Sequence, residues 1–266
     1  MFYHARESTI NIPNNTINYI SFGSGKKKLL MIQGLNTNTI KGMAIPLALM
    51  YRIFAKEYTV YLFDRKTTLD DDITVKEMAD DIALALDILG IDEVDVLGVS
   101  EGGMIAQYLA INYPDLVNKL VLALTLSRNN PVTEAVIKHW ITLCEAENYK
   151  ALIIDMAYKM YSAQYLKLYR PFLPLLTHIQ KPKDPKRFMT LCQSCLTCST
   201  YNDLDKIKCP TFVIGAKEDL IVGSESSLEI VDKLKCPLYM YENLGHAAYE
   251  EATNFNQLVY DFLIKN

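Results

Sequence analysis

The chain has 266 residues, of which 50% are hydrophobic and 22% charged, and its formal net charge is −4. This length allows one large domain, or one domain that carries an insertion. The apolar content excludes disorder, and the negative balance argues against a nucleic-acid surface and against attraction to anionic membranes. No apolar run approaches the roughly 18 residues of a membrane helix. No signal peptide is visible after Met1, so a cytoplasmic protein is expected.

Short apolar runs alternate with longer periodic segments along much of the chain. The runs are rich in Val, Ile, Leu, Phe and Tyr and predict buried strands at 29–33, 60–63, 94–98, 120–124, 211–215 and 238–241. Apolar residues at spacings of three and four predict helices over 75–89, 102–113 and 254–264. This alternation predicts an α/β fold with a mostly parallel central sheet flanked by helices. The segment 17–22 alternates in polarity and is expected to be an antiparallel edge strand.

The alternation stops between residues 127 and 207. Helical patterns cover 133–147 and 149–168, and no convincing strand is present. We therefore predict a core domain formed by 1–126 and 208–266, with 127–207 inserted as a helical cap. Aromatic residues of the cap either line a pocket or form the cap's own core; they include Trp140, Tyr158, Tyr161 and Tyr165.

The strongest chemical signal is the sequence Gly-Val-Ser-Glu-Gly at residues 98–102. It follows a predicted strand and opens a predicted helix, which is the context of a nucleophile elbow. Glycines allow the tight turn, and the helix N-terminus favours the negative charge that develops during acyl transfer. Ser100 is therefore the candidate nucleophile.

A serine nucleophile needs a base, which is usually a histidine. The chain has four: His4 near the N-terminus, His139 and His178 in the predicted cap, and His246 after the last predicted strand. Active sites of parallel sheets gather at the carboxyl ends of the strands. His246 is therefore the preferred base, and the others are expected to be surface or pocket-lining residues.

The base in turn needs a carboxylate that fixes its tautomer. Asp219 follows the predicted strand 211–215 and precedes His246, which gives the order Ser, Asp, His that this type of elbow uses. Glu218 competes with it, and Asp203 and Asp205 are weaker candidates.

Three cysteines, Cys192, Cys195 and Cys198, have a spacing that resembles a metal site. Zinc needs four ligands, and residues three apart on a helix simply share a face. We therefore expect buried thiols and no metal. All six cysteines are expected to be reduced.

These motifs resemble the α/β-hydrolase superfamily over nearly the whole chain. The resemblance is carried by residues 29–35, 63–65, 98–104, 210–221 and 245–246. It is strongest to the small microbial branch with a helical cap, which includes esterases, carbon–carbon bond hydrolases, proline iminopeptidases and haloperoxidase-like enzymes. The resemblance implies Ser100 as nucleophile, Asp219 as acid, His246 as base and no cofactor.

The resemblance also implies an oxyanion hole made by the backbone amides of Leu35 and Glu101. Three positions depart from the family pattern. Gln33 replaces the usual His before Gly34, and Lys-Thr-Thr at 66–68 replaces a glycine-containing loop. Glu101 is charged where an apolar or amide residue is common, and would repel acidic substrates if it pointed into the pocket.

The sequence thus predicts a serine hydrolase that acts on a small to medium carboxylic ester or related acyl substrate. Carbon–carbon bond hydrolysis and aminopeptidase activity stay open within the same family, the latter with Glu145 and Glu147 as the carboxylates available in the cap. A non-catalytic small-ligand-binding protein is the alternative class. The expected partner is a small molecule, not nucleic acid or a membrane, and a homodimer is left open.

Overall fold

The computed structural model describes residues 2–265 and contains one eight-stranded sheet in the order β1-β2-β4-β3-β5-β6-β7-β8. The strands from β4 to β8 in that order run parallel, and β2 is antiparallel to both of its neighbours. The strands are β1 (Arg6–Ile12), β2 (Asn15–Gly23), β3 (Lys27–Ile32), β4 (Tyr58–Phe63), β5 (Val94–Val99), β6 (Val117–Ala123), β7 (Thr211–Ala216) and β8 (Leu238–Tyr241). The α/β fold with a mostly parallel central sheet, predicted from the sequence, is confirmed.

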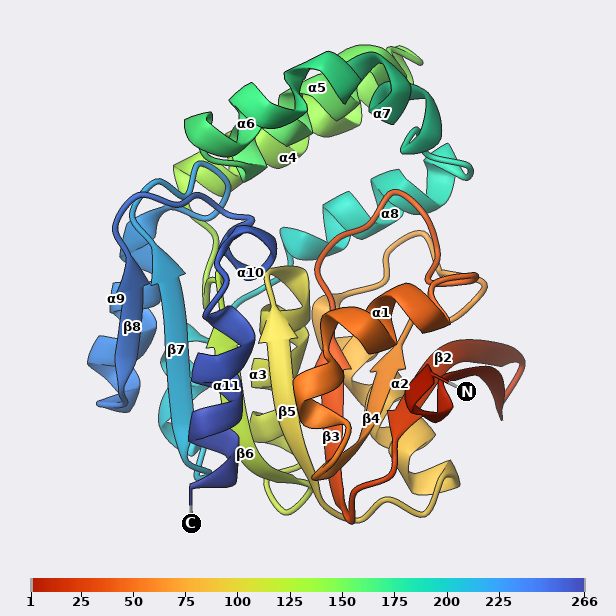
Figure 1. Cartoon of the computed structure of the whole chain (residues 1–266), viewed down its shortest axis with the longest axis vertical. Coiled ribbons are helices and arrows are strands. Elements are labelled where there is room, and N and C mark those ends of the chain that lie inside the picture. Colours follow the sequence, from red (N-terminus) through yellow and green to blue (C-terminus); the bar gives the residue numbers. More distant parts are fainter. Residues whose placement is uncertain (1, 266) are drawn as a thin grey trace.

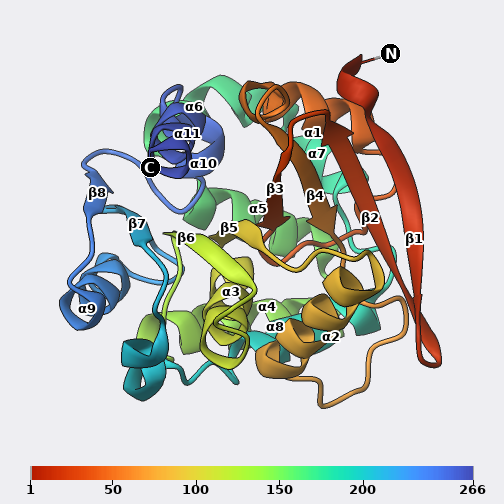
Figure 2. The same cartoon turned by 90° about the horizontal axis from the view of Figure 1, so that it is seen from below.

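Helices cover both faces of the sheet (Figures 1 and 2). One face carries α2 (Val75–Ile88), α3 (Glu101–Asn112) and α9 (Ser224–Leu234), and the other carries α1 (Ala44–Met50) and α11 (Phe255–Ile264). The short helix α10 (Ala248–Glu251) precedes α11. No helix among residues 2–265 combines the length and the apolar character needed to cross a bilayer.

Side chains that alternate along the strands feed two separate cores. In β3, Leu30 and Ile32 pack with the α2–α3 side, whereas Leu29 and Met31 pack with the α1–α11 side. Every residue of β5 and β7 is buried. A parallel strand covered on both faces needs apolar residues at every position, which explains the continuous apolar runs in the sequence.

The six predicted buried strands each overlap one observed parallel strand, and the three predicted helices are α2, α3 and α11. The prediction of an antiparallel edge strand at 17–22 was correct in strand direction and wrong in position. The segment lies in an antiparallel strand, β2, but β1 pairs outside it and forms the edge. Strand β1 has only two buried residues, Ile10 and Ile12, so its sequence lacks the apolar pattern of a strand.

Between β6 and β7 the chain forms helices that lie across the carboxyl ends of the strands (Figure 1). They are α4 (Pro131–Glu145), α5 (Tyr149–Met160), α6 (Ala163–Tyr169), α7 (Leu173–Ile179) and α8 (Pro185–Cys195). All fall within 127–207, the predicted cap, and are called the cap helices below. The single helical pattern predicted for 149–168 is wrong: Tyr161 is extended and Ser162 caps a new helix, with its hydroxyl accepting from the Tyr165 amide.

Candidate active site

Ser100 lies at the sharp turn between β5 and α3 with φ 54° and ψ −122°, a strained backbone conformation for a residue with a side chain. Two glycines make the turn possible by close packing. A Cβ at Gly98 would lie 2.6 Å from the Gly102 carbonyl oxygen, and a Cβ at Gly102 would lie 2.0 Å from that of Ile32. The turn therefore has the geometry of a nucleophile elbow, as its sequence predicts.

Hydrogen bonds hold the Ser100 backbone in this position. Its amide donates to the carbonyl of Ala123 at 2.9 Å, and the Thr125 hydroxyl donates to the Ser100 carbonyl at 2.7 Å. Ala123 is the last residue of β6, the strand next to β5, and Thr125 follows it two residues later. The strained turn is thus anchored to the neighbouring strand.

His246 links the serine to a carboxylate. Its Nε2 lies 2.8 Å from Ser100 Oγ, and its Nδ1 lies 2.8 Å from Asp219 Oδ2. The serine follows β5, the aspartate follows β7 and the histidine follows β8, so the carboxyl ends of the strands bring together residues from distant parts of the chain. His246 is 3% exposed and Asp219 is 6% exposed, so water is excluded from this contact.

The Asp219 carboxylate is held from both sides. Its Oδ1 accepts hydrogen bonds from the amides of Ile221 at 2.9 Å and Val222 at 3.0 Å. Burial raises the pKa of this carboxyl, but His246 and the two amides outweigh burial and bring the pKa below its usual value. Asp219 is therefore ionised at neutral pH and orients His246.

The competing sequence candidates lie elsewhere. Glu218 is exposed, although it is adjacent to Asp219. His139 has a half-exposed side chain and lies 3.9 Å from Asp155 in the cap helices, and His178 is exposed on α7. Among the described residues, neither of these histidines contacts Ser100 or Asp219.

Two backbone amides beside Ser100 have no hydrogen-bond partner among residues 2–265: those of Leu35 and Glu101. Glu101 is a buried residue, and a buried amide without a partner is rare. Gly34 brings the other amide close, since a Cβ at this position would lie 3.0 Å from Ser100 Cβ. The arrangement fits an oxyanion hole, in which free amides await a developing negative charge.

The Glu101 side chain points away from the cavity and forms a buried ion pair with Arg65. The distance from Arg65 Nη2 to Glu101 Oε2 is 2.7 Å, and the side chains are 5% and 1% exposed. The same Nη2 donates to the carbonyl of Gln33 at 2.7 Å, and the Ser194 hydroxyl donates to Glu101 Oε1 at 3.3 Å. This network joins the loop before Leu35, the elbow and helix α8. It leaves Glu101 no role as a charged pocket wall.

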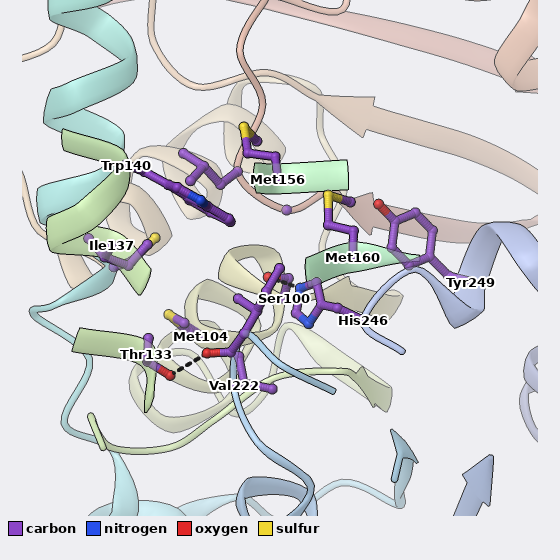
Figure 3. Close-up of a pocket in the computed structure, with 14 residues that line it drawn as sticks. Ser100, Met104, Thr133, Ile137, Trp140, Met156, Met160, Val222, His246 and Tyr249 are labelled. Carbon is purple, nitrogen blue, oxygen red and sulfur yellow. Dashed lines mark hydrogen bonds between the residues drawn. The ribbon is translucent and has the colours of Figure 1, made fainter. Parts of the chain in front are cut away.

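A mostly apolar cavity, called the inner cavity below, lies above Ser100 and His246 (Figure 3). Its wall includes Met104, Ile137, Trp140, Met156, Met160 and Val222. The space open to the centre of a water molecule is about 40 Å³. A water needs about 10–15 Å³ on this measure, so the cavity has room for a group of about three waters in size.

Polar groups in the wall of the inner cavity are already bonded. The Thr133 hydroxyl donates to the Ile221 carbonyl at 2.9 Å, and Trp140 Nε1 donates to Asp155 Oδ2 at 2.8 Å. The Cys195 thiol donates to the Leu191 carbonyl. The inner cavity therefore accepts an apolar group next to the serine.

Sequence reasoning predicted Ser100, Asp219, His246 and the two amides, and the structure brings all five together. It missed the role of the Arg65 side chain, although residues 63–65 are among the motifs that carry the resemblance, and it missed the methionines of α5, which belong to no motif. Of the aromatic cap residues, Trp140 lines the inner cavity, whereas Tyr161 and Tyr165 stack on each other with ring centroids 4.9 Å apart. The sequence could have indicated a cationic partner such as Arg65, because a charged Glu101 beside the nucleophile requires one.

The cysteines of the metal-like motif lie on and just after α8. Cys192, Cys195 and Cys198 are all buried and unpaired. Residues 2–265 contain no cluster of His, Cys, Asp or Glu suited to a metal ion. Burial raises the pKa of each of these thiols, which keeps them protonated.

Comparisons with known proteins agree with this architecture. A family model of the α/β-hydrolase fold matches residues 28–153. A Caulobacter protein named "Putative carbamate hydrolase RutD" is 28% identical over 185 residues, covering 66% of this chain and 69% of its own. A protein of the same name from Rhizobium rhizogenes is 25% identical over 223 residues, covering 79% and 84%.

Two solved structures are similar over almost their whole length. An α/β-hydrolase enzyme from a Medee basin deep-sea metagenome library has a TM-score of 0.88 at 21% identity, covering 97% of this chain and 98% of its own. The enol-lactonase of Burkholderia xenovorans has a TM-score of 0.85 at 17% identity, covering 97% and 100%. At these identities the likeness shows the fold alone.

Sheet order, elbow and cap helices define a protein of the α/β-hydrolase fold. The family match and the structural neighbours agree with this fold, and a hydrolase is the class of enzyme that these findings support.

Proposed function

We propose that the protein is a serine hydrolase that cleaves esters of small apolar acids through an acyl-enzyme. The observation that carries the proposal is the chain of two 2.8 Å contacts from Ser100 through His246 to Asp219, set beneath a mostly apolar cavity. Acyl transfer requires a serine, a base that is hydrogen-bonded to it, a group that orients the base, and two free amides, and this site has all of them.

In the proposed mechanism, Ser100 Oγ attacks the ester carbonyl carbon while His246 Nε2 takes its proton. The amides of Leu35 and Glu101 bind the oxyanion, and Asp219 stabilises the imidazolium. The carbon–oxygen bond then breaks as His246 gives the proton to the leaving alcohol. A water molecule next attacks the acyl carbon while His246 takes a proton from it. The bond from the acyl carbon to Ser100 Oγ then breaks as His246 returns the proton to this oxygen, and the acid leaves.

The inner cavity favours a short acyl group. Space for about three waters corresponds to a few carbon atoms. Because the wall has bonded polar groups, an acyl part with a free amine or hydroxyl would lose its hydrogen bonds to water without replacement. Acetate and propionate esters are therefore the proposed substrates.

The name of the RutD relatives points to a carbamate as the second candidate. Hydrolysis of a carbamate uses the same attack on a carbonyl carbon. The amino group of a bound carbamate would lie near Thr133 and Trp140, whose polar atoms already donate to other residues. The inner cavity therefore favours the ester, and relative rates on ethyl acetate and ethyl carbamate decide between them.

An aminopeptidase is less well supported. Glu145 and Glu147, the cap carboxylates considered for binding a substrate amine, are exposed. Neither is among the residues that line the inner cavity.

The test is intact-mass spectrometry after reaction with a fluorophosphonate, which labels activated serines. We expect one adduct on the wild type and none on Ser100→Ala or His246→Ala. The matched controls are Ser199→Ala and His139→Gln, because both side chains are solvent-accessible and outside the site. These controls should label like the wild type.

Labelling of Ser100→Ala, or a folded wild type that neither labels nor hydrolyses short esters, would contradict the proposal. The second result would favour the non-catalytic ligand-binding class. Circular dichroism of each variant separates loss of the nucleophile from loss of the fold.

A further inference from the structure

A second cavity adjoins the inner cavity and shares four wall residues with it: Leu35, Met156, Met160 and Tyr249. We call it the outer chamber. The volume open to the centre of a water molecule is about 170 Å³ in the outer chamber and about 40 Å³ in the inner cavity. A substrate bound at Ser100 can thus extend past these shared residues into a larger space.

The outer chamber lies on the histidine side of the serine. In Figure 3, Met160 and Tyr249 stand beside His246, whereas Ile137 and Thr133 lie on the other side of Ser100. The Met160 carbonyl accepts the amide of Ala247 at 2.8 Å, which fixes α5 against the histidine loop. His246 delivers its proton to the leaving group, so the leaving group occupies the side of the serine that the histidine faces.

The two cavities differ in chemistry. The wall of the outer chamber adds five polar side chains to the shared residues: Asn36, Thr37, Tyr161, Gln180 and Glu250. The inner cavity, in contrast, has bonded polar groups and an apolar wall. A substrate that fits both is apolar at its acyl end and polar at its alcohol end.

Glu250 is the only acidic or basic side chain in that wall. Its carboxylate accepts a hydrogen bond from the Tyr161 hydroxyl at 2.5 Å, and burial together with its charge raises the pKa of Tyr249 well above the usual value. Among residues 2–265, no Lys, Arg or His lies within 4.0 Å of it. The chamber thus presents a negative charge without a cationic partner.

We propose that the outer chamber is a binding site for a cationic leaving group, so that the preferred substrates are short-chain esters of ammonium-bearing alcohols. The inference rests on the proposed function and deepens it, since it assigns the alcohol half of the substrate. Glu250 supplies the charge that attracts the cation, and the rings of Tyr161 and Tyr249 border the same space. An anionic alcohol would be repelled by the same carboxylate.

The test compares two esters of the same shape: acetylcholine and 3,3-dimethylbutyl acetate, in which a carbon atom replaces the charged nitrogen. The quantity measured is the ratio of kcat/KM for the cationic ester to that for the neutral ester. We expect the wild type to favour the cation by about tenfold at low ionic strength, with a smaller ratio in high salt.

Glu250→Gln keeps the size of the side chain and removes the charge. We expect it to lower the ratio about tenfold, to near one. The intrinsic reactivities of the two esters cancel when the ratio is compared between variants. Glu242→Gln is the matched control: it removes the charge of an exposed glutamate that pairs with Lys217 and lines neither cavity. Its ratio should equal that of the wild type.

The experiment distinguishes failure of the cationic site from failure of the proposed esterase. Hydrolysis of the neutral ester with a ratio that Glu250→Gln does not change would overturn the cationic site and leave the esterase standing. Absence of both fluorophosphonate labelling and hydrolysis of the neutral ester would overturn the esterase and this inference with it. An equal loss of the ratio in Glu242→Gln would show a general charge effect and would also overturn the site.

Discussion

Asp219 lines neither cavity, so its effect on the proposed reaction passes through His246. With the carboxylate replaced by an amide, the Nδ1 atom faces a group that can donate, and the histidine adopts the wrong tautomer. We expect Asp219→Asn to lower kcat on a short ester by about 10³–10⁴-fold with a small change in KM. The exposed neighbour provides the control: Glu218→Gln should stay within about twofold of the wild type. A kcat for Asp219→Asn near that of the wild type would contradict the assigned role.

The same carboxylate links stability to pH. The folded-state pKa of Asp219 lies below its ordinary value of 3.8, so its ionised form stabilises the fold above that pH, and the contribution is lost as the pH falls through the folded-state pKa. The stability difference between wild type and Asp219→Asn should therefore shrink in acid. Urea unfolding of both proteins at pH 7 and at about pH 3.5 measures it. A difference that grows in acid would contradict the direction of the shift.

Arg65 and Glu101 form an ion pair that is too buried for either partner to remain alone. Removing one charge leaves the other buried and unpaired, which typically costs about 3–5 kcal/mol. We expect Glu101→Leu to lower the free energy of unfolding by about this amount, and Arg65→Met together with Glu101→Leu to recover much of the loss. Denaturant unfolding of the single and double variants measures the coupling. If Glu101→Leu and the double variant lost the same free energy of unfolding, the ion pair would not act as a unit.

At the scale of single elements, the elbow depends on the contact between α3 and the end of β3. A Cβ at position 102 would lie 2.0 Å from the Ile32 carbonyl, so the helix start must shift if Gly102 is replaced. We expect Gly102→Ala to destabilise the fold by about 3 kcal/mol or more and to abolish labelling of Ser100. Gly90→Ala is the control. It has no neighbour within 4 Å and a φ of 65°, so only about 1 kcal/mol of backbone strain is expected.

The parallel strands were predictable because burial on both faces requires continuous apolar runs. Helices α2, α3 and α11 were predictable from apolar residues at spacings of three and four, whereas α9, between β7 and β8, was not predicted. Strand β1 and helix α1 were not predicted either. In β1 most side chains are exposed, and in α1 only Ala48 is buried. The break between α5 and α6 was also hidden, because it comes from the extended backbone of Tyr161 and the cap at Ser162 rather than from glycine or proline.

The candidate catalytic residues were predictable for a different reason. Each lies at the carboxyl end of a predicted parallel strand, so the sheet order alone brings Ser100, Asp219 and His246 together. The cavity walls were not predictable. Met156, Met160 and Glu250 lie on elements whose approach is set by tertiary packing, for which the sequence contains no local signal.

Over the whole molecule, the six thiols fall into two groups. Cys144, Cys192, Cys195 and Cys198 are buried, whereas Cys209 and Cys236 are partly exposed. Burial raises the pKa of all six, so little thiolate is present at neutral pH. We expect iodoacetamide at pH 8 to modify Cys209 and Cys236 slowly in the native protein, and all six rapidly in guanidinium. Peptide mapping identifies the modified sites, and early modification of Cys195 would contradict the burial and the raised pKa of this thiol.

The contact between Ser100 and His246 spans 146 residues of chain. A ribosome adds about 5–20 residues each second, so the histidine is synthesised roughly 7–30 s after the serine. During that time the elbow has no base, and β7 and β8 are still being synthesised. The growing polypeptide therefore lacks the contact between Ser100 and His246, and the candidate site assembles only after β8 and the loop that follows it have left the ribosome and docked.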